Sequence, residues 1–385
     1  MALYIAIFIA IGIIYFLNAQ NGGMPKSVFA GIIIFLAVFV GLGDMLGGYD
    51  RYIYAELFDN TADQYKLGEN FINSTIHNYY TVELGYGYLN WIIAHVTANR
   101  YIFILLVTLI MYYLFYRNFI EETDNYGFAL LLFLGLYFFF TFTYLRQALA
   151  VALIGFSYRY IVRRNLILYC LFVAIATSFH NSAVLFFPMY WLCWRIPSKP
   201  VIIAVALICF IIGSTNLPSS LFDAYGDISE ETYNRNRYTT DVYDANNVFR
   251  IEYIIEAIIF LIFLFINHNS NNNNRRYIVH YNIALCFCAI LLIFCKSTNG
   301  GRLAWPFIFG VICAVTPKAK YSRGLQLNSF ALICMGFLLY LRVLSGWGAL
   351  LYPYKTFLTP GAREGDYIHY VYEYDNRYDN DKFYR

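Results

Sequence analysis

The chain has 385 residues, of which 60% are hydrophobic and only 13% are charged. Soluble globular proteins usually carry about 25% charged residues, so this composition excludes a soluble protein and indicates an integral membrane protein. The formal net charge of +3 is too small to indicate a nucleic-acid partner, and no basic segment interleaved with aromatic residues lies in a polar loop.

Twelve apolar runs follow one another along the chain. Several approach the roughly 20 residues that span a bilayer, and shorter ones can tilt or be partly re-entrant. We therefore predict an all-α, polytopic membrane protein with about 12 transmembrane helices. The first run has no basic residue before it, which favours a retained helix over a cleaved signal. The runs are 2–18, 27–46, 99–117, 125–142, 145–161, 166–178, 182–194, 201–216, 249–266, 277–295, 303–316 and 324–343.

Polar segments divide the chain into one membrane domain and a tail. Residues 1–344 are predicted to form a single transmembrane helical domain that includes two long outer loops, 47–98 and 217–248. Residues 345–385 form a tyrosine-rich outer tail. In the first loop, residues 83–96 carry apolar side chains at helical spacing but are too few to span a bilayer, which predicts a short interfacial or re-entrant helix.

Basic residues gather on one side when the runs are placed in alternating order across the bilayer. The positive-inside rule makes that side cytoplasmic, so the long polar segments and both termini face outward. The loop 117–124 supports this orientation least, because it carries one arginine against three acidic residues. The cations on this side are Lys26, Arg117, Arg159, Arg163, Arg164, Arg195, Lys199, Arg275, Arg276, Lys318, Lys320 and Arg323.

Motifs for metal or nucleotide chemistry are missing from the sequence. All eight cysteines fall inside or at the edge of apolar runs, which is typical of packing residues and predicts neither disulfides nor a zinc site. The sequence contains no phosphate-binding GxxxxGK[ST] loop, no HExxH and no GxSxG. Asp379 and Asp381 form the only D-x-D, in the tail, where a solvated charge run is the simpler explanation. We expect no metal and no cofactor.

Polar residues at the outer ends of apolar runs are the most informative feature of the chain. A charged residue near the centre of a membrane helix costs about 2.5–3.5 kcal/mol on insertion scales, and a place near the interface lowers this cost. With the orientation above, four sites far apart in sequence converge on the outer face. Their residues are Arg51, Arg146 with Gln147, His180 with Asn181, and Arg302.

Each of these residues also has a purely structural explanation. Arg146 could extend to lipid phosphates, Arg302 could anchor a helix at the interface, and Arg51 could pair with Asp50. His180 could be a helix-end residue that bonds to a neighbouring carbonyl. All of these residues are predicted to lie on the same side of the membrane. This coincidence favours a shared site more than any one residue does.

Arginines at helix starts suit a phosphate ligand. A guanidinium stays charged and offers a planar fork of donors, and a helix N-terminus adds unpaired N–H groups and a favourable dipole. Arg146 and Arg302 both stand at predicted outer helix starts. They are therefore predicted to bring two cations to one anion, and a pyrophosphate at the outer membrane surface is the natural candidate.

Six short motifs, spread over most of the chain, carry a family resemblance. They are GGYDRYIYAELF (47–58), VELGYGYLNWII (82–93), YLRQALAVAL (144–153), SFHNSAVLFFP (178–188), GGRLAWPF (300–307) and LYPYKTF (351–357). In this order they resemble the EpsG-like, Wzy-type polysaccharide (O-antigen) polymerases. The resemblance implies a GT-C-like fold and a glycosyltransferase of the bacterial inner membrane with its active site facing the periplasm.

The resemblance also implies the reaction and its partners. A growing glycan chain would move from undecaprenyl diphosphate onto the non-reducing end of a new lipid-linked repeat unit, without metal or nucleotide sugar. Donor and acceptor are both undecaprenyl-diphosphate-linked oligosaccharides. Membrane lipids, a chain-length regulator and a flippase are the further partners expected.

Residue roles follow from the same resemblance. Arg146 and Arg302 would grip the donor diphosphate and stabilise its developing charge. His180 is the first candidate for the general base on the acceptor hydroxyl, because imidazole titrates near neutral pH. In the alternative, His180 binds phosphate and Asp50 or Glu83 removes the proton.

The remaining predicted site residues bind or orient substrate. Arg51 is either a third cation or a residue that orients Asp50. Tyrosine and tryptophan side chains of the outer segments are candidates for stacking on sugar faces, although tyrosine is common at membrane interfaces. The predicted substrate-binding residues are Asp50, Glu83, Tyr144, Gln147, Asn181, Tyr352 and Tyr354.

Other functions compete with the polymerase. A flippase or transporter of lipid-linked oligosaccharide should carry cations through the depth of the membrane, whereas the unusual residues here cluster outside. A membrane O-acyltransferase would need a deep polar path to a cytoplasmic acyl donor. A ligase differs from a polymerase only in its acceptor, so the sequence leaves these two open.

Overall fold

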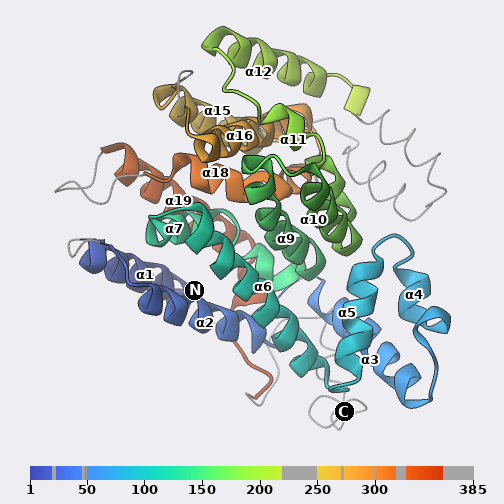
Figure 1. Ribbon diagram of the computed structural model, residues 1–385. Coiled ribbons are helices and arrows are strands. Elements are labelled where there is room, and N and C mark those ends of the chain that lie inside the picture. Colours follow the sequence, from blue (N-terminus) through green and yellow to red (C-terminus); the bar gives the residue numbers. More distant parts are fainter. Residues whose placement is uncertain are drawn as a thin grey trace. The chain divides into compact units, whose positions relative to one another are not determined.

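The computed structural model describes residues 1–19, 23–45, 48, 50–218, 249–269, 273–297, 300–317 and 327–358. Within these ranges the regular structure is helical and no β-strand occurs (Figure 1). Most of the predicted outer loop 217–248 and the tail beyond residue 358 lie outside the described residues.

The chain divides into two compact units. The first consists of Met1–Leu153, Ala174–Asn181 and Thr316–Arg385, and the second of Ile154–Val173 and Ser182–Val315. Helices α9 (Leu145–Val162) and α10 (Leu166–Phe179) each contribute to both units.

Long helices form the core of the first unit. Helix α2 (Lys26–Gly41) packs along α6 (Arg100–Glu122), and α7 (Tyr126–Leu136) packs along α19 (Leu327–Gly346). Helix α1 (Ala2–Ala19) contacts both α7 and α19. Helix α7 is apolar and buried on all sides, as expected of a helix at the centre of a bundle.

Shorter helices of the first unit carry the first outer loop. Helix α3 (Arg51–Lys66) packs on α5 (Leu84–Ala94) and on α6, and a buried ion pair between Asp59 and Arg100 joins α3 to α6. The short helix predicted at 83–96 is confirmed as α5. The other short elements are η1 (Phe71–Asn73), α4 (Thr75–Tyr79), α8 (Phe140–Thr143) and α20 (Gly348–Leu351).

The second unit is built around α16 (Arg275–Ile293). Helices α12 (Lys199–Ser214), α15 (Ile251–Ile266) and α18 (Ile308–Val315) all pack on α16. Most of the side chains of α16 are buried, although it begins with two exposed arginines. The short elements of this unit are η2 (Asn181–Phe186), whose first residue belongs to the first unit, α11 (Met189–Leu192), α17 (Gly301–Ala304) and η3 (Trp305–Phe307).

Most predicted apolar runs form single helices, but the run 182–194 does not. It forms η2 and α11, and Pro188 lies between them. Proline has no N–H and its ring clashes with the preceding turn, so a helix cannot run through this position undisturbed. The run 125–142 is also divided, into α7 and α8, and an aromatic segment of low helix propensity separates the two.

Four helices are long and apolar enough to cross a membrane, namely α1, α6, α16 and α19. Several shorter apolar helices accompany them, including α2, α10 and α12. The chain is therefore a helical membrane protein. The number of about 12 spans stays a prediction.

Two glycines face each other where α7 meets α19. A β-carbon added to Gly135 would overlap the backbone of Gly336. A β-carbon added to Gly336 would meet only ordinary contacts, with its nearest neighbour, Leu132 Cδ2, at 3.7 Å. Small residues of this kind let two helix backbones approach closely in a membrane protein.

We expect Gly135→Ala to destabilise the protein by about 1–3 kcal/mol, because the added methyl group pushes α19 away from α7. Gly336→Ala is the matched control in the same contact and should leave the stability unchanged or slightly higher. Thermal unfolding of the purified proteins in detergent measures both. Equal melting temperatures for the two variants would contradict the close approach at Gly135.

Candidate functional site

Arg146 lies in the first turn of α9, directly after the residue at which the helix begins. The first N–H groups of a helix have no partner within the helix, so a cation and backbone donors come together here. The Arg146 side chain is 18% exposed. A ligand can therefore reach it, although most of its surface contacts protein.

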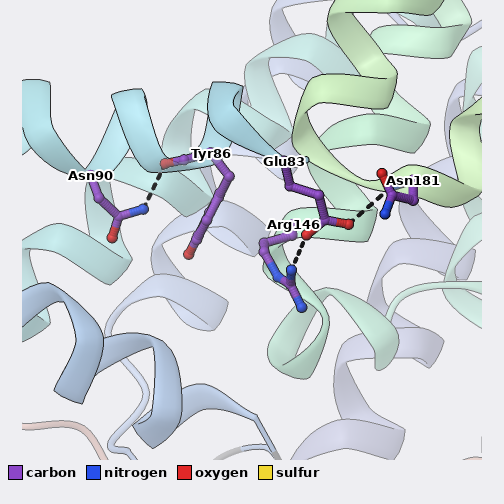
Figure 2. A network of polar contacts seen from close by, with 5 residues as sticks. All are labelled: Glu83, Tyr86, Asn90, Arg146 and Asn181. Carbon is purple, nitrogen blue, oxygen red and sulfur yellow. Dashed lines mark hydrogen bonds and ion pairs between the residues drawn. The ribbon is translucent and has the colours of Figure 1, made fainter. Parts of the chain in front are cut away.

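Glu83 joins Arg146 to a third segment of the chain (Figure 2). Its Oε2 forms an ion pair with Arg146 Nη1, and its Oε1 accepts a hydrogen bond of 2.9 Å from the backbone N–H of Asn181. Glu83 stands at the N-terminal end of α5, and Asn181 follows the end of α10. Three motifs that are far apart in sequence thus meet on one carboxylate.

A glycine allows this meeting. Gly85, two residues after Glu83, lies so close to the end of α10 that a β-carbon there would overlap the side chain and carbonyl of Ser178. The close approach brings the Asn181 N–H within reach of the Glu83 carboxylate. The ELGYG and SFHN segments therefore dock through their backbones as well as through Glu83.

Tyrosine rings surround the Arg146 guanidinium. Its central carbon lies 4.9 Å from the ring centroid of Tyr80 and 5.6 Å from that of Tyr54, within the range of a cation–π interaction. Tyr86 packs edge-on against both rings, with centroid distances of 5.4 Å to Tyr80 and 5.7 Å to Tyr54. We call Tyr54, Tyr80 and Tyr86 the tyrosine cage.

Burial disfavours the charged form of two phenols of the tyrosine cage. Burial raises the pKa of the Tyr80 phenol, although the nearby Arg146 charge opposes this shift. Burial likewise raises the pKa of Tyr86. The amide of Asn90 donates a 2.7 Å hydrogen bond to the backbone carbonyl of Tyr86, one helical turn earlier on α5 (Figure 2). Glu83 is therefore the acidic partner of Arg146, and the tyrosines hold the guanidinium without adding charge.

His180 directly precedes Asn181, whose backbone N–H is bonded to Glu83. The backbone N–H of His180 donates to the carbonyl of Ala176 at 3.1 Å, which extends the last turn of α10. The residue is only 7% exposed. The backbone of the next residue, Asn181, is bonded to Glu83. The backbone of His180 is therefore held close to the carboxylate that pairs with Arg146.

Arg51 is fully buried at the start of α3. Its Nη2 donates to the carbonyls of Gly41, at 3.0 Å, and Gly43, at 2.9 Å, where α2 ends. A cation on the last carbonyls of a helix complements the helix dipole. Asp50 is partly exposed at the N-cap position of α3, and its side chain makes no capping hydrogen bond.

The aromatic residues predicted to bind sugar differ in accessibility. Tyr352 is 60% exposed. Tyr354 stacks on Phe39 at 4.2 Å and donates to the Phe39 carbonyl, so one face of its ring is occupied. The ring of Tyr144 packs near Trp347, and Gln147 is buried within α9.

Arg302 belongs to the second unit and is described there. It lies in α17, and its guanidinium carbon is 5.7 Å from the ring centroid of Trp305. A β-carbon at the preceding Gly301 would overlap the ring of Tyr253, so glycine is needed for α15 to pack against this turn. Arg302 is partly exposed.

The tyrosine cage was not predicted from the sequence. Tyr54 stands one turn after Asp50 and Arg51 on α3, and Tyr80 stands three residues before Glu83. This closeness in sequence to charged motif residues was the one sign that these tyrosines belong to the site. Within the described residues, no group of three or more histidine, cysteine, aspartate or glutamate side chains is arranged to hold a metal ion.

The model of the EpsG family matches residues 26–356, a range that includes all the candidate site residues above. No curated protein and no solved structure matches the chain.

We expect Glu83→Ala to lower the free energy of unfolding by about 3 kcal/mol, because it leaves the partly buried Arg146 charge without its acidic partner. Glu121→Ala is the matched control. Glu121 pairs with Arg117 across one helical turn and is more exposed than Glu83, so its loss should change stability by less than about 0.5 kcal/mol. Thermal unfolding in detergent separates the two, and equal effects would contradict a special role for the Glu83 ion pair.

Proposed function

The chain belongs to the EpsG family, and from this premise we propose that it is a membrane glycosyltransferase that polymerises polysaccharide repeat units. In this proposal it lies in the bacterial inner membrane, with about 12 spans in a GT-C-like arrangement and its active site facing the periplasm. The donor is a glycan chain on undecaprenyl diphosphate. The acceptor is a lipid-linked repeat unit, which is extended at its non-reducing end.

The cluster around Arg146 is the observation that carries this proposal. A guanidinium in the first turn of a helix, partly exposed and held by Glu83 and two tyrosine rings, is preorganised to receive an anion. Arginine matches the geometry of phosphate better than lysine does, because its planar fork donates two parallel hydrogen bonds. A lipid diphosphate provides such an anion.

The proposed reaction breaks one bond and forms one. The acceptor hydroxyl oxygen attacks the anomeric carbon of the donor sugar, and the bond between that carbon and the phosphate oxygen breaks. The diphosphate leaves with the electron pair, and Arg146 stabilises its growing negative charge. Arg302, on α17 of the second unit, is proposed to bind phosphate as well.

His180 takes the proton of the acceptor hydroxyl in this mechanism. Both oxygens of Glu83 are already bonded, one to Arg146 and one to the Asn181 N–H, so Glu83 serves better as a holder of Arg146 than as a base. Asp50, which makes no capping bond at the start of α3, is the alternative base.

Arg51 acts at a distance in this proposal. Its bonds to the end of α2 fix the start of α3, and α3 carries Tyr54 of the tyrosine cage. Tyr144, Gln147, Asn181, Tyr352 and Tyr354 are proposed to line the path of the glycan. Of the two tyrosines in the LYPYKTF motif, Tyr352 is the more exposed.

We expect Arg146→Lys to reduce polymer formation at least about 100-fold while the protein is still produced, because lysine cannot form the bidentate clamp. Arg117→Lys is the control. Arg117 also pairs with a carboxylate, but it lies near the C-terminal end of α6 and is not one of the candidate site residues. Gel analysis of surface polysaccharide from cells carrying each variant measures chain length. Wild-type chain lengths with Arg146→Lys would remove this residue from the site.

Deletion of the gene tests the proposed function itself. A polymerase predicts loss of long chains with single repeat units retained. Loss of all units would point to flipping or ligation, and unchanged chain length with a missing ester would point to acyl transfer. Either of these outcomes would overturn the polymerase proposal.

The base is tested by comparing His180→Gln with Asp50→Asn in a polymerisation assay on lipid-linked repeat units. Loss of a general base should lower kcat by about 100-fold or more. We expect this loss for His180→Gln and a small change for Asp50→Asn. The opposite order, with His180→Gln raising KM, would assign His180 to phosphate binding and Asp50 to proton removal.

A further inference from the structure

In the second unit, two arginines approach one exposed tryptophan. The ring of Trp194 is 4.3 Å from the guanidinium carbon of Arg164 and 5.2 Å from that of Arg275. Trp194 is 64% exposed and follows α11, whereas Arg164 follows α9 and Arg275 begins α16. Three separate segments therefore place two cations on one aromatic side chain.

Arg164 occupies a position that glycine usually takes. Its φ of 55° lies in the left-handed region, two residues after the end of α9. This conformation costs a side-chain-bearing residue roughly 1–2 kcal/mol. The guanidinium offsets the cost by donating to the carbonyls of Tyr190, at 2.8 Å, and Cys193, at 3.2 Å. Arginine is thus fixed here by its side chain, which extends toward Trp194.

No acidic residue from these parts of the chain balances the two arginines. The sequence contains no aspartate or glutamate between Asp124 and Asp223, and none between Glu256 and Glu364. Neither Arg164 nor Arg275 forms an ion pair within the described residues. Burial, and then the nearby Arg275 charge, lower the pKa of Arg164.

More basic residues lie at the helix ends of this unit. The ends of α9, α11, α12 and α16 carry further basic side chains of the same acid-free segments, and all of these are exposed. They are Arg163, Arg195, Lys199 and Arg276. Basic residues in segments that contain no acid favour the approach of an anion from outside the protein.

Exposed apolar side chains adjoin the cations. On α10, which begins two residues after Arg164, Ile167 is 80% exposed and Leu171, one turn further, is 50% exposed. Trp191 and Leu192 of α11 are also more than half exposed. Cations that give way to exposed apolar surface along a helix match the two parts of a phospholipid, the headgroup and the acyl chain.

We propose that Arg164, Trp194 and Arg275 bind the phosphate headgroup of an anionic phospholipid of the cytoplasmic leaflet, whose acyl chains lie along Ile167 and Leu171 of α10. The two guanidinium groups contact the phosphate, and the indole ring fixes both of them at the depth of the headgroups. This site is separate from glycosyl transfer and does not depend on the proposed function.

The test is thermal unfolding of the full-length protein in neutral detergent, titrated with phosphatidylglycerol, phosphatidylcholine or inorganic phosphate. We expect phosphatidylglycerol alone to raise the melting temperature of the wild type in a saturable manner. Arg275→Gln should weaken the apparent affinity for phosphatidylglycerol about fivefold, the effect of one interfacial cation. Arg275 is chosen because Arg164 also bonds to backbone carbonyls, so its loss could disturb folding.

Two further variants make the result decisive. Lys66→Gln removes an exposed cation at the end of α3 and should leave the response to phosphatidylglycerol unchanged. Trp194→Leu keeps an apolar side chain but removes the ring between the arginines, and should weaken phosphatidylglycerol binding as Arg275→Gln does. An equal response to phosphatidylcholine would overturn the site. So would an equal response to inorganic phosphate, or wild-type affinity in both Arg275→Gln and Trp194→Leu.

Discussion

The ion pair between Arg146 and Glu83 is the interaction on which the arrangement of the candidate site depends. It joins residues 63 positions apart, and the second oxygen of Glu83 holds the backbone of Asn181, 98 positions further along the chain. A partly buried guanidinium is stable only if an opposite charge or strong acceptor stands beside it. Glu83 thus determines where the start of α9, the start of α5 and the end of α10 lie in the first unit.

The tyrosine cage links this ion pair to the rest of the first unit. Tyr54 extends from α3, whose first residue, Arg51, is bonded to the carbonyls at the end of α2. The buried pair of Asp59 and Arg100 attaches the same helix to α6. Helix α3 is therefore held at two points along its length, and Tyr54 lies between them. A residue far from any substrate, such as Arg51, can influence the site through this helix.

The sequence predicted the framework of the site better than its contacts. Apolar length and the Arg-Gln pair placed the start of α9 at Leu145, and charge on the loops assigned Glu83, Arg146 and Asn181 to the same face. Patterns of this kind define a side of the membrane, but they do not select one acid among several in a loop. The Glu83–Arg146 pair needed the tertiary structure, in which Gly85 brings α5 against the end of α10.

Two other features were not predicted from the sequence, each for a different physical reason. The burial of Arg51 could not be predicted, because its acceptors are backbone carbonyls of Gly41 and Gly43, which any residue type supplies. The run 182–194 was predicted as one span from apolar length alone, although Pro188 within it was a visible sign of interruption. Length measures how far an apolar segment can reach, whereas proline and hydrogen bonding decide whether it remains one helix.

The ion pair with Glu83 leaves part of the hydrogen-bonding capacity of Arg146 unused. A guanidinium carries five N–H donors, and the ion pair with Glu83 engages Nη1. The Nε of Arg146 is buried and has no hydrogen-bond partner among the described residues. A buried donor without a partner is unfavourable, so an anion that reaches it would gain a hydrogen bond that the resting protein lacks. In the proposed function, such an anion would bind beside Glu83 instead of displacing it. The carboxylate would then keep the guanidinium in place while the remaining donors took up the charge of the ligand.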